Sequence, residues 1–230
     1  MAPDEGVKGI VICLKDCLDG MELVDDTGIR VMAGVTMTRA AVFAANRGLS
    51  GLEFAHGIPG TVGGGVYMNA GAYGGEVCQV AELVEVMDMD GNITELTNEE
   101  MRFSYRHSVL EEKGGIVISA VFRLTHKPVD EIKAKMKELM EKRSASQPLD
   151  LPSAGSAFKR PVGGYAAALI DQAGLKGFQV GGAGISKKHA GFAVNLGGAT
   201  AKDVRDLLAQ VSEKVFISSG IRLEPEVRIW

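Results

Sequence analysis

Residues 56–75 read HGIPGTVGGGVYMNAGAYGG, and this glycine-rich segment does most to decide the fold. Eight of its twenty residues are glycine, yet apolar side chains such as Ile58, Val62 and Val66 recur through it. A flexible linker lacks apolar anchors of this kind, so the segment belongs to a packed domain. Glycine at this density lets a packed backbone approach another group closely or adopt a positive φ angle.

From Thr61 onward the spacing favours a short helix, and we expect its free N-terminal N–H groups to face a phosphate. The segment matches neither a Walker A motif nor a G-x-G-x-x-G motif after a strand, so a tightly packed turn is the structural alternative. Phosphate or cofactor binding is the function that these residues favour.

The composition of the 230-residue chain narrows the function classes. A net charge of −4 argues against nucleic acid as the main partner, because no basic surplus exists to displace counterions. No apolar run reaches the roughly 18 residues that cross a bilayer, and the N-terminus lacks a signal-peptide pattern. We therefore expect neither a nucleic-acid partner nor a membrane partner.

The cysteines are sparse and odd in number: Cys13, Cys17 and Cys78. Cys13 and Cys17 lie four residues apart with no His/Cys cluster beside them, so we expect no metal site. Buried, reduced thiols are the simplest interpretation, and they are typical of a cytoplasmic protein.

The first ninety residues are expected to form short strands and turns, and further strands follow them. One helix is predicted at 38–47, with Thr36 or Thr38 as its N-cap and Gly48 as its stop signal. The dipeptide Asp90-Gly91 predicts a hairpin turn between two strands. The predicted strands are 7–14, 21–24, 29–33, 81–89, 92–96 and 115–124.

The pattern changes at residue 129. Residues 129–143 predict a charged amphipathic helix, with Ile132, Met136, Leu139 and Met140 on one apolar stripe. A proline-punctuated connector follows, so we place a boundary between domains 1–143 and 144–230. The later predicted elements are helices at 164–173 and 201–216, the latter capped by Thr200, and strands at 192–196 and 226–230. Without regular βαβ alternation, this mixture favours an α+β fold.

Four further patches carry reactive side chains: RFSYRHS from residue 102, PSAGSAFKRP from 152, VGGAGISKKHAGFAVN from 180 and LEPEVRIW from 223. Each has a structural alternative. Arg106 suits a surface ion pair, Ser156 a loop cap and His189 a packed core position. Glu226 suits a partner for Arg228. No G-x-S-x-G pattern surrounds Ser156, so a hydrolase triad is unsupported.

Taken in order, GIPGTVGGGVYMNAGAYGGEV, FSYRHS, PSAGSAFKRP, SKKHAGFAVN and EPEVRIW resemble the UDP-N-acetylenolpyruvoylglucosamine reductase (MurB) family. The resemblance covers nearly the whole chain. It implies part of an FAD-binding domain of the PCMH/vanillyl-alcohol-oxidase-like type, followed by a C-terminal α+β substrate-binding domain. The short spacing between Arg106 and Ser156 resembles the subtype that lacks an inserted substrate-capping loop.

The family resemblance also implies a reaction. NADPH would give a hydride to FAD, which would pass it to the enolpyruvyl double bond of a UDP-sugar and so form UDP-N-acetylmuramate. That product serves peptidoglycan synthesis, and through the cell wall it serves cell shape and cell division. The resemblance implies a cytoplasmic flavoprotein oxidoreductase, monomeric when intact, with NADPH and the UDP-sugar as its small-molecule partners.

The resemblance assigns roles to individual residues. Arg106 and Glu226 would stabilise the charge that follows hydride transfer, and Ser156 would deliver the proton. The substrate-binding candidates are Tyr73, Arg160, Lys187 and Arg228. The FAD-binding candidates are Gly57, Ile58, Pro59, Gly60, Thr61, Gly63, Gly64, Asn69, Gly71 and Ala72.

Two departures from the family pattern stand out. Family members carry an N-terminal subdomain with a G-x-G-S-N-like phosphate loop before the strand that corresponds to 7–14, and they continue briefly beyond the position of Trp230. We therefore expect an N-terminally truncated chain. One alternative function is a non-catalytic remnant that binds the UDP-sugar without FAD. A different FAD oxidoreductase is disfavoured, because GSAFKRP and EPEVRIW belong to the substrate half of the pattern.

Overall fold

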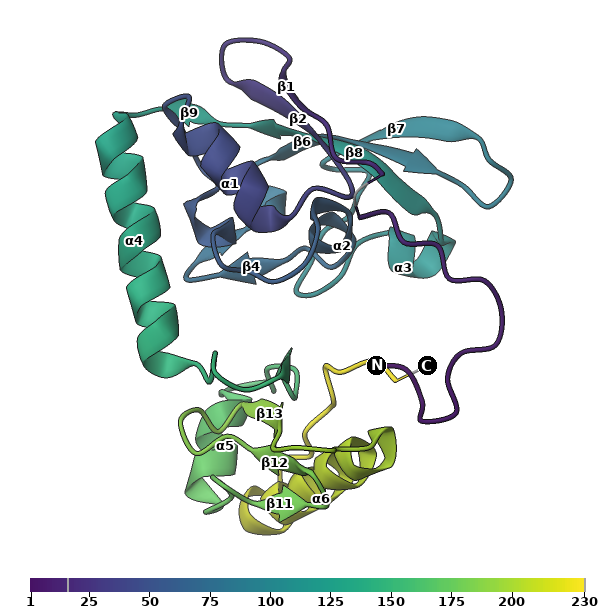
Figure 1. Ribbon diagram of the computed structural model, residues 1–230, viewed down its shortest axis with the longest axis vertical. Helices are drawn as coiled ribbons and strands as arrows, with labels where there is room; N and C mark the ends of the chain where they lie inside the picture. The colour runs from purple at the N-terminus through teal and green to yellow at the C-terminus, as the bar shows by residue number, and fades with distance from the viewer. Residues whose placement is uncertain (16, 230) are drawn as a thin grey trace. The chain divides into compact units, whose positions relative to one another are not determined.

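The computed structural model describes residues 1–15 and 17–229, and the chain divides into two compact units. The first unit is Val11–Arg143, and the second comprises Met1–Ile10 and Ser144–Trp230. The division falls between Arg143 and Ser144, in the last turn of the helix Val129–Ser146 that Figure 1 labels α4. Met1–Ile10 are grouped by their contacts with the second unit. Their anchor there is the Asp4 carboxylate, which accepts a hydrogen bond from the N–H of Ala201.

The first unit is built on a five-stranded antiparallel sheet in the order β1-β2-β8-β6-β7. Its strands are β1 (Met21–Leu23), β2 (Gly28–Met32), β6 (Ala81–Met87), β7 (Ile93–Thr97) and β8 (Ile116–Arg123). Two smaller sheets pair β3 (Leu49–Ser50) with β9 (Thr125–His126), and β4 (Gly71–Ala72) with β5 (Gly75–Glu76). The hairpin predicted around Asp90-Gly91 is confirmed by the pairing of β6 with β7, but its loop is longer than the two residues expected, because the strands end at Met87 and Ile93 and only Gly91 has a positive φ.

The helices of this unit are α1 (Met37–Ala45), α2 (Val62–Tyr67), α3 (Leu110–Lys113) and α4 (Val129–Ser146), with short 3-10 turns η1 (Glu53–Ala55) and η2 (Val77–Gln79). The N-cap prediction for α1 is confirmed at Thr36, whose hydroxyl oxygen accepts a hydrogen bond from the N–H of Arg39. Helix α2 packs against β8, so the glycine-rich segment belongs to the folded core.

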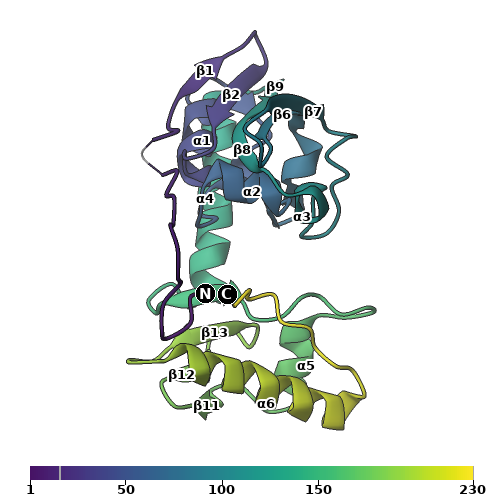
Figure 2. The ribbon, with the colours of Figure 1, turned by 90° about the vertical axis from the view of Figure 1, so that its right-hand side faces the viewer.

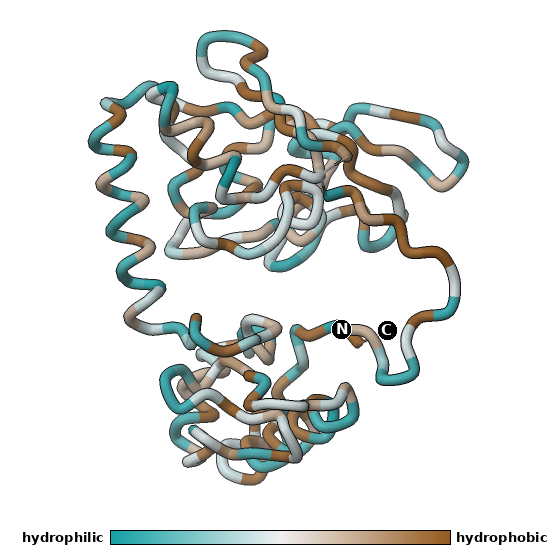
Figure 3. Tube along the Cα trace, in the orientation of Figure 1, coloured by the Kyte–Doolittle hydropathy of each residue, from teal (hydrophilic) through white to brown (hydrophobic). Residues whose placement is uncertain are grey.

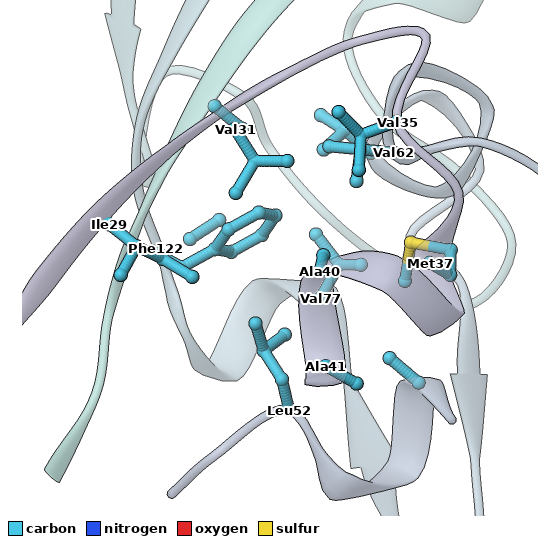
Figure 4. Close-up of a cluster of buried hydrophobic side chains, with 14 of the residues drawn as sticks. Ile29, Val31, Val35, Met37, Ala40, Ala41, Leu52, Val62, Val77 and Phe122 are labelled. Carbon is cyan, nitrogen blue, oxygen red and sulfur yellow. The ribbon is translucent and has the colours of Figure 1, made fainter. Parts of the chain in front are cut away.

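The core of the first unit lies between the sheet and helices α1 and α2. Figure 4 shows Phe122 of β8 beside Ile29 and Val31 of β2, with Val62 of α2 nearby. All four of these side chains are fully buried. Burial of side chains of this size stabilises a fold by about 1.5–3 kcal/mol each, so α2 is fixed firmly to the sheet.

The second unit is a four-stranded sheet in the order β10-β13-β12-β11, covered by two helices. Its elements are β10 (Ser153–Ser156), α5 (Ala166–Gln172), β11 (Gln179–Val180), β12 (Ala183–Ile185), β13 (Phe192–Asn195) and α6 (Ala201–Ser219). Helix α6 packs against β11 and β12 and also contacts α5 (Figure 2). Thr200 caps α6 as predicted, in a capping box with Asp203.

Two predicted strands are wrong. Residues 7–14 form no strand, and Figure 3 shows their apolar run as an extended trace. Ile10 and Val11 are 93% and 78% exposed. A β-rich run makes a strand only where a neighbouring strand accepts its hydrogen bonds, and the described residues provide none here. Residues 226–229 form no strand either, although Pro225 makes an isolated bridge to Phe158. Trp230 lies outside the described residues.

The expectation of buried thiols is wrong for two cysteines. Cys13 and Cys17 are both exposed. Cys78 is half-buried, and burial raises the pKa of its thiol. Within residues 1–15 and 17–229, no helix has the length and apolar character needed to traverse a membrane.

Candidate functional site

The N-terminal N–H groups of α2 are occupied by the protein itself. Val62 and Gly63 donate hydrogen bonds of 2.7 and 2.9 Å to carbonyl oxygens in the chain that follows β2. Gly64 donates to the hydroxyl oxygen of its N-cap, Thr61, at 3.4 Å. The short helix is present as predicted, but the expectation that these N–H groups are free to face a phosphate is wrong.

Several glycines of the segment serve internal packing. A Cβ atom on Gly63 would lie 2.9 Å from the Cβ of Ala33, and one on Gly65 would lie 2.7 Å from the Sδ of Met37. Both distances are shorter than real Cβ contacts allow. These glycines therefore let α2 lie directly on the strand and helix beside it. The segment thus approaches side chains of the protein itself at Ala33 and Met37.

Other glycines of the same segment face open space. Gly60 has a φ of +124° and a Cβ placed there would meet nothing within 4 Å. On Gly64 the nearest atom would be the Thr61 hydroxyl oxygen, at 3.8 Å. Pro59, Gly60 and Gly64 are all exposed, so the backbone on both sides of Thr61 is uncovered. A bare main chain of this kind fits a cofactor that lies flat against it.

Asn69 is committed to the protein. Its side chain is 1% exposed, and its amide nitrogen donates to Glu76 Oε2 and to the carbonyl oxygen of Ser104, both at 3.0 Å. Its Oδ1 accepts from the N–H of Cys78 at 2.9 Å. The side chain of Asn69 thus joins the glycine-rich segment to two other loops, and its influence on a cofactor would be through that framework.

Arg106 lies at a tight turn beside the glycine-rich segment. The turn is closed by hydrogen bonds between the backbones of Ser104 and His107. The guanidinium of Arg106 donates to the carbonyl oxygen of Gly71 at 3.4 Å and lies over the ring of Tyr105 at 5.2 Å. Two patches far apart in the sequence are therefore neighbours in the first unit.

Backbone strain is concentrated here. Among the residues that the structure describes, four non-glycine residues have a positive φ: Asn69, Tyr73, Arg102 and Arg106. Three of the four are predicted site residues. Asparagine adopts this conformation readily, whereas tyrosine and arginine do so rarely and at a cost. Strain of this kind persists where the surroundings impose it, and it clusters at functional sites.

Tyr73 occupies the tip of the β4–β5 hairpin. Tyr73 and Gly74 have φ angles of +54° and +86°, as in a two-residue turn of type I′. Such turns favour Asn-Gly, so a bulky ring at the first turn position is unusual. Tyr73 is 44% exposed and is thus accessible to a ligand.

Ser156 and Glu226 are neighbours within the second unit. Ser156 ends β10 and is exposed. The N–H of Glu226 donates a 2.9 Å hydrogen bond to the carbonyl oxygen of Ala157, the residue after Ser156. The side chain of Glu226 is half-buried. The structure thus brings these two candidates together, while the third, Arg106, belongs to the first unit.

The other substrate-binding candidates also lie in the second unit. The guanidinium of Arg160 lies 4.6 Å from the centre of the Tyr165 ring. Lys187 is exposed and its stem packs over Gly177, while Arg228 is exposed near the end of the chain. All three side chains are accessible to an anionic ligand.

His189 occupies a packed position in this unit. Its Nδ1 accepts a 3.1 Å hydrogen bond from the N–H of Gly191, and its ring meets the Phe192 ring edge to face. Burial lowers the pKa of His189 below its usual value. These contacts favour the structural alternative for His189 over a catalytic role.

One buried charge escaped the sequence predictions. Arg143, in the last turn of α4, is only 7% exposed, and its guanidinium lies 5.5 Å from the centre of the Tyr73 ring. The stripe Ile132, Met136 and Leu139 extends by helical spacing to position 143. That spacing was the available signal.

Comparison with known proteins identifies both halves of the chain. Residues 147–230 match the C-terminal domain of UDP-N-acetylenolpyruvoylglucosamine reductase, and residues 1–97 match an FAD binding domain. The UDP-N-acetylenolpyruvoylglucosamine reductase of Latilactobacillus sakei is 49% identical over 98% of this chain and 74% of that protein. The chain belongs to the UDP-N-acetylenolpyruvoylglucosamine reductase family. The enzyme of the same name from Caldanaerobacter subterraneus is 47% identical over 100% of this chain and 75% of that protein.

A solved structure supports the same family. The crystal structure of the MurB reductase from Thermus caldophilus superposes with a TM-score of 0.79 at 43% identity, covering 90% of this chain and 73% of that chain. The predicted fold class is confirmed: an FAD-binding domain of the PCMH-like type precedes the MurB C-terminal domain, with mixed helices and strands.

Proposed function

We propose that the protein catalyses NADPH-dependent, FAD-mediated reduction of UDP-N-acetylglucosamine enolpyruvate to UDP-N-acetylmuramate. The observation that carries the proposal is the contact of Arg106 with Gly71, because it joins a fixed cation to the glycine-rich backbone. A cation beside Gly71 would contact the substrate at the point where the substrate contacts the cofactor. In this account the enzyme is cytoplasmic and monomeric, and it supplies peptidoglycan synthesis.

The cofactor would be held by the backbone on both sides of Thr61, where Gly60 and Gly64 leave open space. The remaining positions assigned to it are Gly57, Ile58, Pro59, Gly63, Asn69, Gly71 and Ala72. When bound, FAD supplies the hydride chemistry that no protein side chain provides. For Asn69 the assignment rests on the backbone, since its side chain is engaged elsewhere.

The protein's own residues manage the charge and the proton. Hydride arriving at the terminal enolpyruvyl carbon pushes negative charge toward the adjacent carbon and its carboxylate. Arg106 presents a planar fork that suits this carboxylate, and Glu226 would help to stabilise the same developing charge. Ser156 Oγ would then give its proton to the adjacent carbon and complete the reduction.

The first experiment asks whether the purified protein binds FAD and whether the bound flavin is reoxidised by the enolpyruvyl substrate. If the protein has this function, bound flavin makes it yellow, and the flavin absorbance is bleached by NADPH and restored by the UDP-sugar. Calorimetric binding of the UDP-sugar without any bound flavin would instead support the non-catalytic alternative. Binding of neither ligand would contradict both functions.

A further inference from the structure

The buried face of α4 ends in a charged residue. Ile132, Met136 and Leu139 are 2%, 6% and 5% exposed, and Arg143 continues the same stripe at 7%. Residues at this spacing lie on one face of a helix. An arginine at an apolar position is costly to bury, so its planar group is expected to have a specific use.

Arg143 touches both ends of the glycine-rich segment. At one end, its Nε and Cδ lie 3.2 and 3.3 Å from the place that a Cβ on Gly57 would occupy. At the other end, its guanidinium lies against the ring of Tyr73. Gly57 has a φ of +87°, and the missing Cβ leaves the room that the arginine fills. One side chain thus spans the segment that carries the cofactor candidates.

Tyr73 needs such a support. Its positive φ is unfavourable for a bulky residue, so neighbouring groups must hold the turn in place. The guanidinium of Arg143 lies beside its ring, and Tyr73 as a whole is 44% exposed. A planar cation beside an aromatic ring is a directional contact that an ammonium group reproduces poorly.

We infer that Arg143 is a positioning residue, which fixes the ring of Tyr73 and the backbone of Gly57 where the UDP-sugar and the cofactor meet. The ligand part of this inference rests on the proposed function, which assigns Tyr73 to the UDP-sugar. Because Arg143 acts through Tyr73, loss of Arg143 should raise the KM for the substrate more than it lowers kcat.

The test compares Arg143→Met with Lys142→Met. Lys142 is the adjacent residue of α4, with a side chain 58% exposed and paired with Glu138, so its loss controls for removal of a cation. In the ligand-free protein, Arg143→Met should speed amide hydrogen exchange across the hairpin 71–76. Unchanged exchange in Arg143→Met would overturn the inference, whether or not the proposed function is correct.

With substrate, Arg143→Met should raise the KM for the UDP-sugar by about tenfold and leave kcat within about twofold, the range of one partly desolvated cation–π contact. Arg143→Lys, which keeps charge and stem, should fail to restore KM. It also replaces Arg143→Met in both measurements if that variant does not fold. Parental kinetics in Arg143→Lys would contradict a role for the planar group.

A double variant isolates the contact itself. Tyr73→Leu removes the ring. If Arg143 acts through that ring, the double variant Tyr73→Leu/Arg143→Met should have nearly the same KM as Tyr73→Leu alone. Fully additive effects would show that Arg143 acts elsewhere and would overturn the inference. If the parent binds no UDP-sugar but hairpin exchange still depends on Arg143, the proposed function fails and the positioning of Tyr73 stands.

Discussion

The side-chain amide of Asn69 donates a 3.0 Å hydrogen bond to the carbonyl oxygen of Ser104. Ser104 is the first residue of the turn that carries Arg106. This bond joins the end of α2 to a loop more than thirty residues later in the chain. Arg106 in turn donates to Gly71, two residues after Asn69. The two contacts form a closed framework, so the position of Arg106 depends on Asn69.

Replacement of Asn69 by alanine should therefore harm both stability and chemistry. The change leaves buried polar partners unsatisfied, and we expect a loss of about 1–3 kcal/mol in the free energy of unfolding. Flavin reoxidation by the enolpyruvyl substrate should slow more than flavin reduction by NADPH, because only the first uses Arg106. Denaturant unfolding and stopped-flow absorbance measure the two effects. Equal slowing of both half-reactions would argue against the link to Arg106.

Ser156→Ala should separate the half-reactions most cleanly. Flavin reduction by NADPH should stay near the parental rate, while reoxidation by the substrate slows by about two or more orders of magnitude, as for loss of a general acid. Ser153→Ala is the control, since that hydroxyl on the same strand bonds only backbone groups. A similar loss in both half-reactions would mean that Ser156 has another role.

Arg106→Lys should show the same asymmetry, because an ammonium group cannot reproduce the planar fork that a carboxylate accepts. Arg102→Lys is the matched control: it has the same type of backbone conformation, but its guanidinium pairs with Glu112 on the surface. Glu226→Gln should also slow only reoxidation. Parental turnover by Arg106→Lys would refute the bidentate role.

Acid should destabilise the second unit through His189. Burial holds the pKa of its imidazole below 6.5, so the unfolded chain binds this proton more readily than the folded chain. Stability should therefore fall as the pH drops below about 6.5 and be unaffected by this group above it. His189→Phe, which keeps a ring beside Phe192, should flatten the dependence of unfolding free energy on pH in that window. An unchanged acid slope would contradict this origin.

Local signals predicted the fold where they were strong. Thr36 and Thr200 each precede a run with helical spacing, and both cap the helices predicted there. Asp90-Gly91 marked the position of a hairpin but not its turn type, because only Gly91 has a positive φ and the N–H of Asp88 bonds the carbonyl oxygen of Asn92 across a longer loop. The apolar run around Ile10 failed because a strand needs a partner, and no property of the run itself reveals whether one exists.

The site was predicted through motifs rather than through contacts. The sequence indicated Arg106 and the glycine-rich segment as functional, but their junction at Gly71 depends on tertiary folding. The occupied N–H groups of α2 were likewise invisible, because their acceptors come from the chain after β2. Arg143 was overlooked since a charged residue at the end of a charged helix normally faces solvent.

The adjacent residues Gly63 and Gly64 test whether the open glycine backbone holds the cofactor. Gly63→Ala would force a Cβ against Ala33, and we expect a loss of about 1–3 kcal/mol in unfolding free energy. Gly64→Ala adds a methyl group in open space, so the protein alone should unfold at the parental temperature or slightly above it.

The decisive measurement is the FAD dissociation constant of Gly64→Ala, determined by flavin fluorescence beside its thermal unfolding. A methyl group between main chain and cofactor should weaken FAD binding by at least about tenfold, which corresponds to about 1.4 kcal/mol. We predict this loss without any loss of stability in the ligand-free protein. Parental FAD affinity in a folded Gly64→Ala variant would contradict the account.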